Sequence, residues 1–157
     1  MDPEVLQSIR SLLESQRVLS LAVLVDGRPE AGLLPYALRA DYRGVYVQAS
    51  ALARHARGLT AGAEVGILIH EPDRADSDPL QITRLSVQAT VTIIDREQSD
   101  YADASARFVA RFAAASVTLA LGDFNLYSLA FGRGRFVTGF ARAFNVGPDT
   151  FTELAST

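Results

Sequence analysis

Residues 45–69 read VYVQASALARHARGLTAGAEVGILI, and the order of residue types in this stretch predicts a strand, a basic connection and a second strand. Residues 45–47 have high strand propensity, and residues 65–69 form an apolar run of strand length. Gly62 precedes the second run and Pro72 follows it, and both residue types favour turns. We therefore expect two neighbouring strands joined by a basic segment.

The basic connection combines several groups that bind anions. Ser50 is a good N-cap residue for a helix that begins near Ala51, and the free N–H groups of such a helix start attract negative charge. Arg54, His55 and Arg57 then fall within one helical turn. One guanidinium group can donate two parallel hydrogen bonds to the oxygens of a phosphate. The segment therefore predicts a phosphate site. In the competing interpretation, the arginines form a solvated face and the histidine lies at its rim.

The order of several segments resembles the pyridoxamine-phosphate-oxidase-like family of FMN-binding split β-barrels. The resemblance extends from about Arg17 to Ile94 and continues more weakly to residue 143. It is closest to the branch of haem-utilisation proteins, through an S-x-L-x-x-H-x-R segment and a later G-F-x-x-A segment. The segments are RPEAGLLPYAL (28–38), GVYVQASALARHARGL (44–59), AGAEVGILI (61–69), QITRLSVQATV (81–91) and GDFNLYSLAFGRGRFVTGFARA (122–143).

This resemblance implies a mainly β fold with flanking helices, namely a six-stranded antiparallel split β-barrel formed by one domain over residues 1–157. It also implies a homodimer with FMN at the subunit interface and an FMN-dependent oxidoreductase that acts on a small molecule. The alternatives are a haem-binding or haem-degrading protein and a non-enzymatic protein that binds flavin or deazaflavin. No residue is indicated as the catalytic acid or base.

The family's cofactor contacts fall on eight residues of this chain. The phosphate contacts fall on Ser50, Arg54, His55 and Arg57, with a further contact on Arg84, and the flavin ring would lie against Leu34, Pro35 and Tyr36.

Two positions depart from the pattern of the family. Gly58 stands where the family often has Asn, which removes one polar contact. Ala141 stands where the family often has Gly, which argues against a left-handed turn because alanine tolerates positive φ poorly.

Composition limits the function further. The chain has no cysteine and no lysine, so thiolate and Schiff-base chemistry are excluded. Its net charge of −3 argues against a nucleic-acid-binding surface. Only His55 and His70 could act as imidazole ligands, and neither lies in a metal-binding motif. Without a signal sequence or an apolar run of about 20 residues, we expect a cytoplasmic protein with no membrane contact.

The remaining sequence predicts the other elements. We expect a helix from Asp2-Pro3 to about Ser15 and another from Gln98 to about Ala115. Strands are expected at residues 17–26, 29–40 and 84–93, the first two joined by an Asp26-Gly27 turn. A second hairpin, with strands at 124–131 and 135–140, is expected around residues 132–134, and residues 144–157 have no clear assignment.

Two further patterns concern assembly and haem. Residues 17–26 are apolar on both alternating faces, so we expect a partner subunit to cover the outer face. Residues 144–157 contain no histidine, whereas haem-utilising relatives can take an axial ligand from a C-terminal segment, which lowers the haem interpretation.

Overall fold

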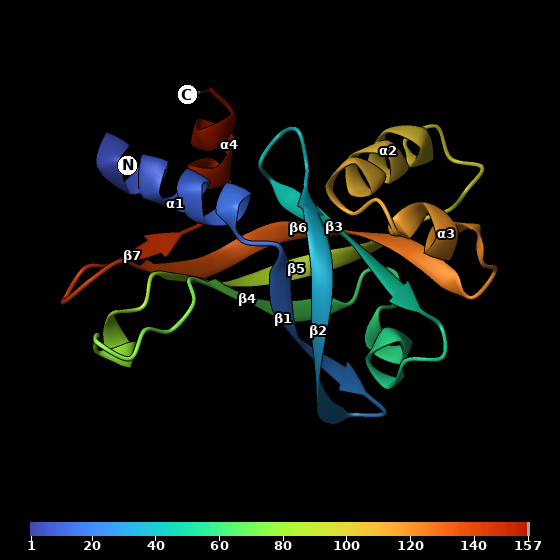
Figure 1. Cartoon of the computed structure of the whole chain (residues 1–157), viewed down its shortest axis with the longest axis horizontal. Coiled ribbons are helices and arrows are strands. Elements are labelled where there is room, and N and C mark those ends of the chain that lie inside the picture. Colours follow the sequence, from blue (N-terminus) through green and yellow to red (C-terminus); the bar gives the residue numbers. More distant parts are fainter. Residues whose placement is uncertain (157) are drawn as a thin grey trace.

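The computed structural model describes residues 1–156 and contains one antiparallel sheet of seven strands (Figure 1). The spatial order is β3-β2-β1-β4-β5-β6-β7, and β3 also pairs with β6. Six strands therefore close into a barrel, which confirms the predicted split barrel, and β7 is added at one end. The strands are β1 (Val18–Val25), β2 (Arg28–Leu38), β3 (Gly44–Ser50), β4 (Glu64–His70), β5 (Arg84–Ile94), β6 (Phe124–Val137) and β7 (Ala143–Val146).

The helices lie outside the barrel. They are α1 (Pro3–Ser15), α2 (Tyr101–Arg111), α3 (Ala115–Ala120), α4 (Pro148–Ser156) and the short 3-10 helices η1 (Arg54–Gly58) and η2 (Pro79–Gln81). Within residues 1–156, none of these helices is long and apolar enough to cross a bilayer.

Alternation of apolar and polar residues sets the inside and outside of the barrel. In β5 every second side chain from Leu85 to Val91 is buried, while Ser86, Gln88 and Thr90 are exposed, as predicted. The β1–β2 hairpin also forms as predicted, and Asp26 and Gly27 both have positive φ, as a tight two-residue turn requires.

Helix α1 begins as the sequence predicts. The Asp2 side chain accepts a hydrogen bond from the Glu4 N–H, and Pro3 occupies the first helical position. Figure 1 shows α1 beside α4 over one end of the sheet, and the Arg10 guanidinium donates to the Leu154 carbonyl. The unassigned tail is therefore β7 followed by a helix that packs on the N-terminal helix.

The helix predicted from residue 98 to 115 is shorter and interrupted. It ends at Arg111, and a separate helix begins at Ala115. Phe112 leaves the helical conformation, and its ring packs 5.2 Å from the Phe108 ring and 5.1 Å from the Arg17 guanidinium. These tertiary contacts override the local helical pattern, and α2 and α3 together cover the second apolar cluster of the protein.

The predicted hairpin around residues 132–134 is wrong, because β6 runs through this segment without turning. The turn instead lies between β6 and β7. Gly139 has φ of 76° and Ala141 has φ of 58°, so alanine does adopt the left-handed conformation that its presence argued against. Pairing of β7 with the end of β6 holds this turn closed.

Candidate functional site

The segment after β3 is a turn followed by a 3-10 helix, and the predicted helix start at Ala51 is wrong. Residues 51–53 form the turn, and η1 contains only five residues. The Ser50 hydroxyl accepts from the Leu52 N–H at 3.2 Å and lies 3.3 Å from the Asp123 carboxylate, to which it can donate. At the end of η1, Gly58 packs directly on the Leu24 carbonyl, where a Cβ would lie 2.6 Å from the oxygen.

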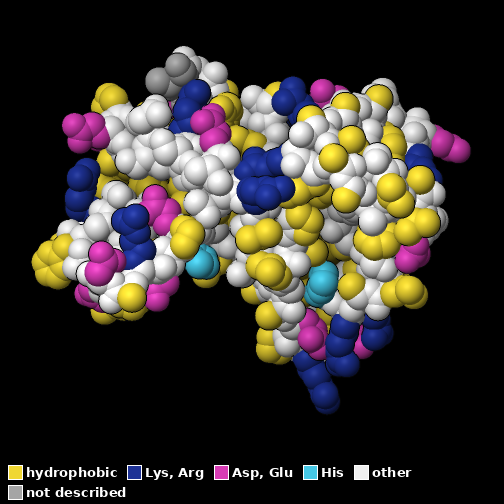
Figure 2. Space-filling model, in the orientation of Figure 1, with side chains coloured by type: hydrophobic (Ala, Val, Ile, Leu, Met, Phe, Trp, Pro, Cys, Tyr) yellow, Lys and Arg dark blue, Asp and Glu magenta, His cyan; other side chains and the backbone are white. Residues whose placement is uncertain are grey.

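The two arginines of η1 face the β1–β2 hairpin, where each meets a carboxylate. Arg54 pairs with Glu30, and Arg57 pairs with Asp26 at 3.2 Å. Both guanidinium side chains are more than half exposed, so each pair contributes at most about 1 kcal/mol to stability. Figure 2 shows basic and acidic side chains mixed over the tip of this hairpin. An added anion would have to compete with these carboxylates.

His55 is held by packing. Its ring lies against Gly32 of β2, where an added Cβ would approach the ring to 2.9 Å. Its Nε2 atom is buried and has no hydrogen-bond partner among the described residues. In this arrangement Nε2 faces protein atoms and is closed to a ligand.

Arg84 is not close to Ser50 at the start of the predicted phosphate site. Arg84 pairs with Val137 at one end of β6, whereas Ser50 pairs with Phe124 at the opposite end. Within one chain, the structure therefore does not bring Arg84 to the predicted phosphate site.

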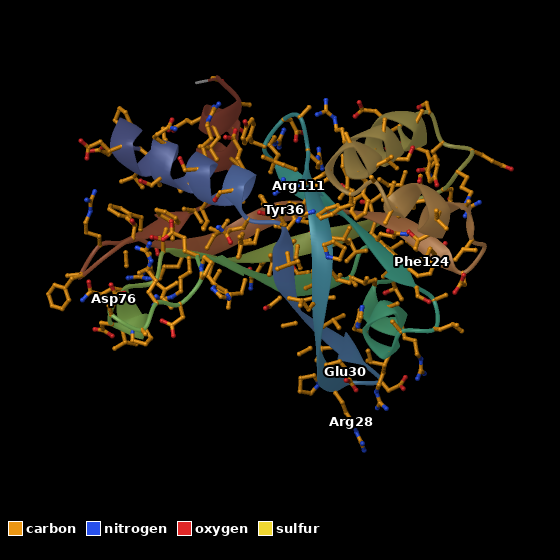
Figure 3. The ribbon with its side chains drawn as sticks, viewed as in Figure 1. Arg28, Glu30, Tyr36, Asp76, Arg111 and Phe124 are labelled. Carbon is orange, nitrogen blue, oxygen red and sulfur yellow. The ribbon has the colours of Figure 1, made fainter. Side chains whose placement is uncertain are left out.

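Of the three residues predicted to contact a flavin ring, two lie inside the barrel. Leu34 and Tyr36 are buried, and only Pro35 is partly exposed. The Tyr36 hydroxyl donates to the Leu13 carbonyl at 2.8 Å, and the Arg111 guanidinium lies 5.0 Å from the ring centre (Figure 3). Burial raises the pKa of Tyr36 strongly, with Arg111 acting in the opposite direction. Tyr36 thus joins α1, α2 and the barrel.

A second location is hollow and carries several arginines. A cavity of about 340 Å³ lies between η2, β5 and the β6–β7 turn. Its lining includes Arg84, Arg135 and Arg142 and one acidic residue, Asp78, whose carboxylate accepts from the Leu80 N–H. Leu80 and Phe140 stand at its sides with 77% and 80% of their surfaces exposed. An amphiphilic anion would meet both guanidinium groups and exposed apolar surface here.

Sequence reasoning identified only Arg84 among these residues. Arg135, Arg142, Phe140 and Leu80 were missed, and the sole signal for them was the G-F-x-x-A segment that contains Phe140 and Arg142. The three arginines come together only because β5, β6 and β7 are adjacent.

His70 lies beside this cavity. It is exposed at the end of β4 and is the direct cross-strand partner of Arg84, so both side chains share the outer face of the barrel. Its Nδ1 lies 2.7 Å from the Glu71 carbonyl oxygen. Because a carbonyl can only accept, Nδ1 carries the proton and the neutral ring has its lone pair on Nε2. This is the arrangement of a metal-binding imidazole whose second nitrogen is held by the backbone.

The outer face of the β1–β2 hairpin is apolar. Val18, Leu24 and Leu33 are exposed over 48%, 63% and 67% of their surfaces. The inner side chains of β1 are buried, so only one of its two apolar faces is covered within the chain. We call these three residues the apolar strip.

Comparison with known proteins agrees with the fold. Residues 5–138 match the family described as Pyridoxamine 5'-phosphate oxidase. The heme oxygenase HutZ of Vibrio cholerae is 28% identical over 148 residues, which cover 93% of this chain and 83% of that protein. A crystal structure described as HutZ, the heme storage protein from Vibrio cholerae, is 25% identical with a TM-score of 0.71 over 91% of this chain and 92% of that chain.

A heme binding protein from Mycobacterium smegmatis also has a similar structure. It is 26% identical, with a TM-score of 0.83 over 98% of this chain. The match covers 62% of that chain, so the present sequence spans less than two thirds of it.

Proposed function

Because the chain belongs to the pyridoxamine 5'-phosphate oxidase family, we propose that it binds haem on the outer face of its barrel, in the arginine-lined cavity beside His70. Two similar proteins, HutZ and the protein from Mycobacterium smegmatis, are 25–28% identical to this chain and carry names that refer to haem. The observation that carries the proposal is an accessible imidazole next to three convergent arginines.

His70 is the proposed axial ligand. Haem iron needs a single imidazole, and the Nε2 atom of His70 is the one whose lone pair faces outward from an exposed ring. The other histidine does not fit this role, because the Nε2 of His55 is buried against β2. The C-terminal segment has no histidine to offer, and its helix packs on α1.

The cavity fits the other parts of haem. Haem carries two carboxylate arms, and Arg84, Arg135 and Arg142 would bind them through charge-assisted hydrogen bonds. Leu80 and Phe140 would lie against the apolar macrocycle. When bound, haem supplies an iron that can bind dioxygen, while these residues bind and orient it.

We further propose that the protein works as a homodimer whose second copy covers the apolar strip. Three large apolar side chains on one hairpin are costly to leave in water, and a symmetric partner would bury them against themselves.

The experiment is a haem titration followed by the Soret absorbance. We expect saturable binding in the wild type, a loss of at least tenfold in affinity with His70→Ala, and a smaller loss with Arg142→Ala. The control His55→Gln should bind like the wild type provided that it folds, which circular dichroism will show. An unchanged Soret band and affinity in His70→Ala would refute the assignment.

FMN binding at η1, with oxidoreductase activity on a small molecule, is the second candidate. Arg54 and Arg57 lie beside each other in exposed ion pairs, which a phosphate can displace at low cost. If FMN binds there, Arg54→Ala with Arg57→Ala should weaken binding by at least tenfold, because two charge-assisted hydrogen bonds are lost. FMN affinity that is unchanged in this double variant would exclude the site.

A further inference from the structure

A β-bulge directs two arginines to the outside of the barrel. Strand β6 pairs with β5 along its length, but the register shifts between Val87 and Ala89. Before the shift, the buried residues of β6 that face the interior are Leu129 and Phe131; after it, the buried residue is Phe136. Val87 pairs with Gly134 and Ala89 with Phe131, so β6 holds one more residue than β5 at this point. This extra residue changes which side chains of β6 face inward. Without it, Arg133 and Arg135 would point into the apolar interior.

The bulge depends on Gly134. A Cβ at this position would lie 2.3 Å from the Ser86 carbonyl oxygen and 2.7 Å from the Val87 Cα, so only glycine allows the two strands to approach this closely. The local sequence Arg133-Gly134-Arg135 thus places two guanidinium groups on one surface, with a flat backbone between them.

The two arginines border a cleft of about 380 Å³ on the outer face of β4, β5 and β6, which we call the bulge cleft. Its polar side chains come from Ser86, Gln88, Arg133 and Arg135, and Gly66 contributes backbone to its lining. Arg135 donates to Asn145 at 3.1 Å and keeps further N–H groups free. The other three side chains have no hydrogen-bond partner within residues 1–156.

The charge of the bulge cleft is not compensated within the described chain. Four other arginines pair with nearby carboxylates, Arg54 and Arg57 among them. No Asp or Glu lines the bulge cleft. On a protein of net charge −3, this is a local concentration of positive charge with free hydrogen-bond donors.

We propose that the bulge cleft is a binding site for the phosphate group of a small molecule, separate from the haem cavity although Arg135 borders both. A phosphate offers several acceptor oxygens, and two guanidinium groups, a hydroxyl and a side-chain amide can each donate to one of them. A carboxylate has only two oxygens, so each oxygen would have to accept from two of the four donors.

The test uses the haem-free wild-type protein and inorganic phosphate. Phosphate should shift the Nε–H signals of Arg133 and Arg135 and the side-chain amide signal of Gln88 in the NMR spectrum. Arg133→Ala should weaken phosphate binding about tenfold or more, because a charge-assisted contact is lost. The matched control Arg28→Ala removes an exposed arginine without a carboxylate partner from the β1–β2 hairpin and should change the affinity by less than twofold.

Acetate, a monocarboxylate with two acceptor oxygens, provides the second arm and should bind more weakly than phosphate. Equal phosphate affinity in Arg133→Ala and the wild type, an equal loss in Arg28→Ala, or tighter binding of acetate would each overturn the proposal. Since no haem is present, its failure leaves the haem proposal standing. Conversely, a His70 variant that keeps haem affinity would refute the haem site without affecting the bulge cleft.

Discussion

Gly134 stands where β5 and β6 approach too closely for any side chain. Gly134→Ala should lower the free energy of unfolding by about 2 kcal/mol or more, because the new methyl group meets backbone atoms that cannot move independently. Gly122→Ala is the matched control, since nothing lies within 4 Å of its Cβ position. Urea denaturation measures both variants. Equal free energies of unfolding in Gly134→Ala and Gly122→Ala would contradict the requirement for glycine at the bulge.

The buried phenol of Tyr36 makes the stability of the fold depend on pH. Burial holds its pKa above the ordinary value, so the folded state keeps the phenol proton when the unfolded chain has lost it. Above about pH 10 the unfolded state therefore binds fewer protons, and stability falls as pH rises. Stability measured between pH 8 and 11 should decline in the wild type and decline less steeply in Tyr36→Phe. Parallel curves would contradict this role.

At the scale of elements, α4 contributes to the core. The Phe151 side chain is fully buried, and its ring centre lies 4.8 Å from that of Phe131 in β6. Phe151→Ala should lower the free energy of unfolding by about 3–5 kcal/mol, the usual cost of removing a buried aromatic ring. Phe140→Ala removes an exposed ring and should change stability by less than about 0.5 kcal/mol. Thermal and chemical denaturation would check both, and equal effects would contradict the packing described for α4.

Elements whose pattern is local were predictable from the sequence. The helix at residues 3–15, the β1–β2 hairpin and β5 follow from a cap, a turn and a period of two. Residues 132–134 were misassigned because Gly-Arg-Gly has the composition of a turn, while its glycine in fact allows β5 and β6 to approach. That requirement depends on a distant strand, so local composition does not show it.

At the scale of the whole molecule, the apolar strip distinguishes one face. If a second copy covers it, Leu24→Glu should shift the protein from dimer to monomer, because each interface would bury two unpaired carboxylates. Leu80→Glu places the same charge on an exposed leucine away from the apolar strip and should leave the assembly unchanged. Light scattering after size-exclusion chromatography gives the mass of each variant. A wild-type monomer would refute the dimer.

The candidate site was only partly predictable at this scale. The sequence indicated basic residues and the correct family, but it placed them together around η1. Arg54 and Arg57 meet carboxylates of the hairpin, whereas Arg135 and Arg142 join Arg84 through pairing of β5, β6 and β7. Which arginines remain free of carboxylates depends on the closure of the barrel, and no segment of the sequence carries this information by itself.

Whether the imidazole of His70 binds haem iron can be measured by chemical rescue. In His70→Gly, electron paramagnetic resonance of ferric haem should lose the histidine-nitrogen coupling seen in the wild type, and added imidazole should restore both the coupling and the Soret band. If His70→Gly retains the wild-type spectrum without imidazole, another group binds the iron and His70 is not the ligand.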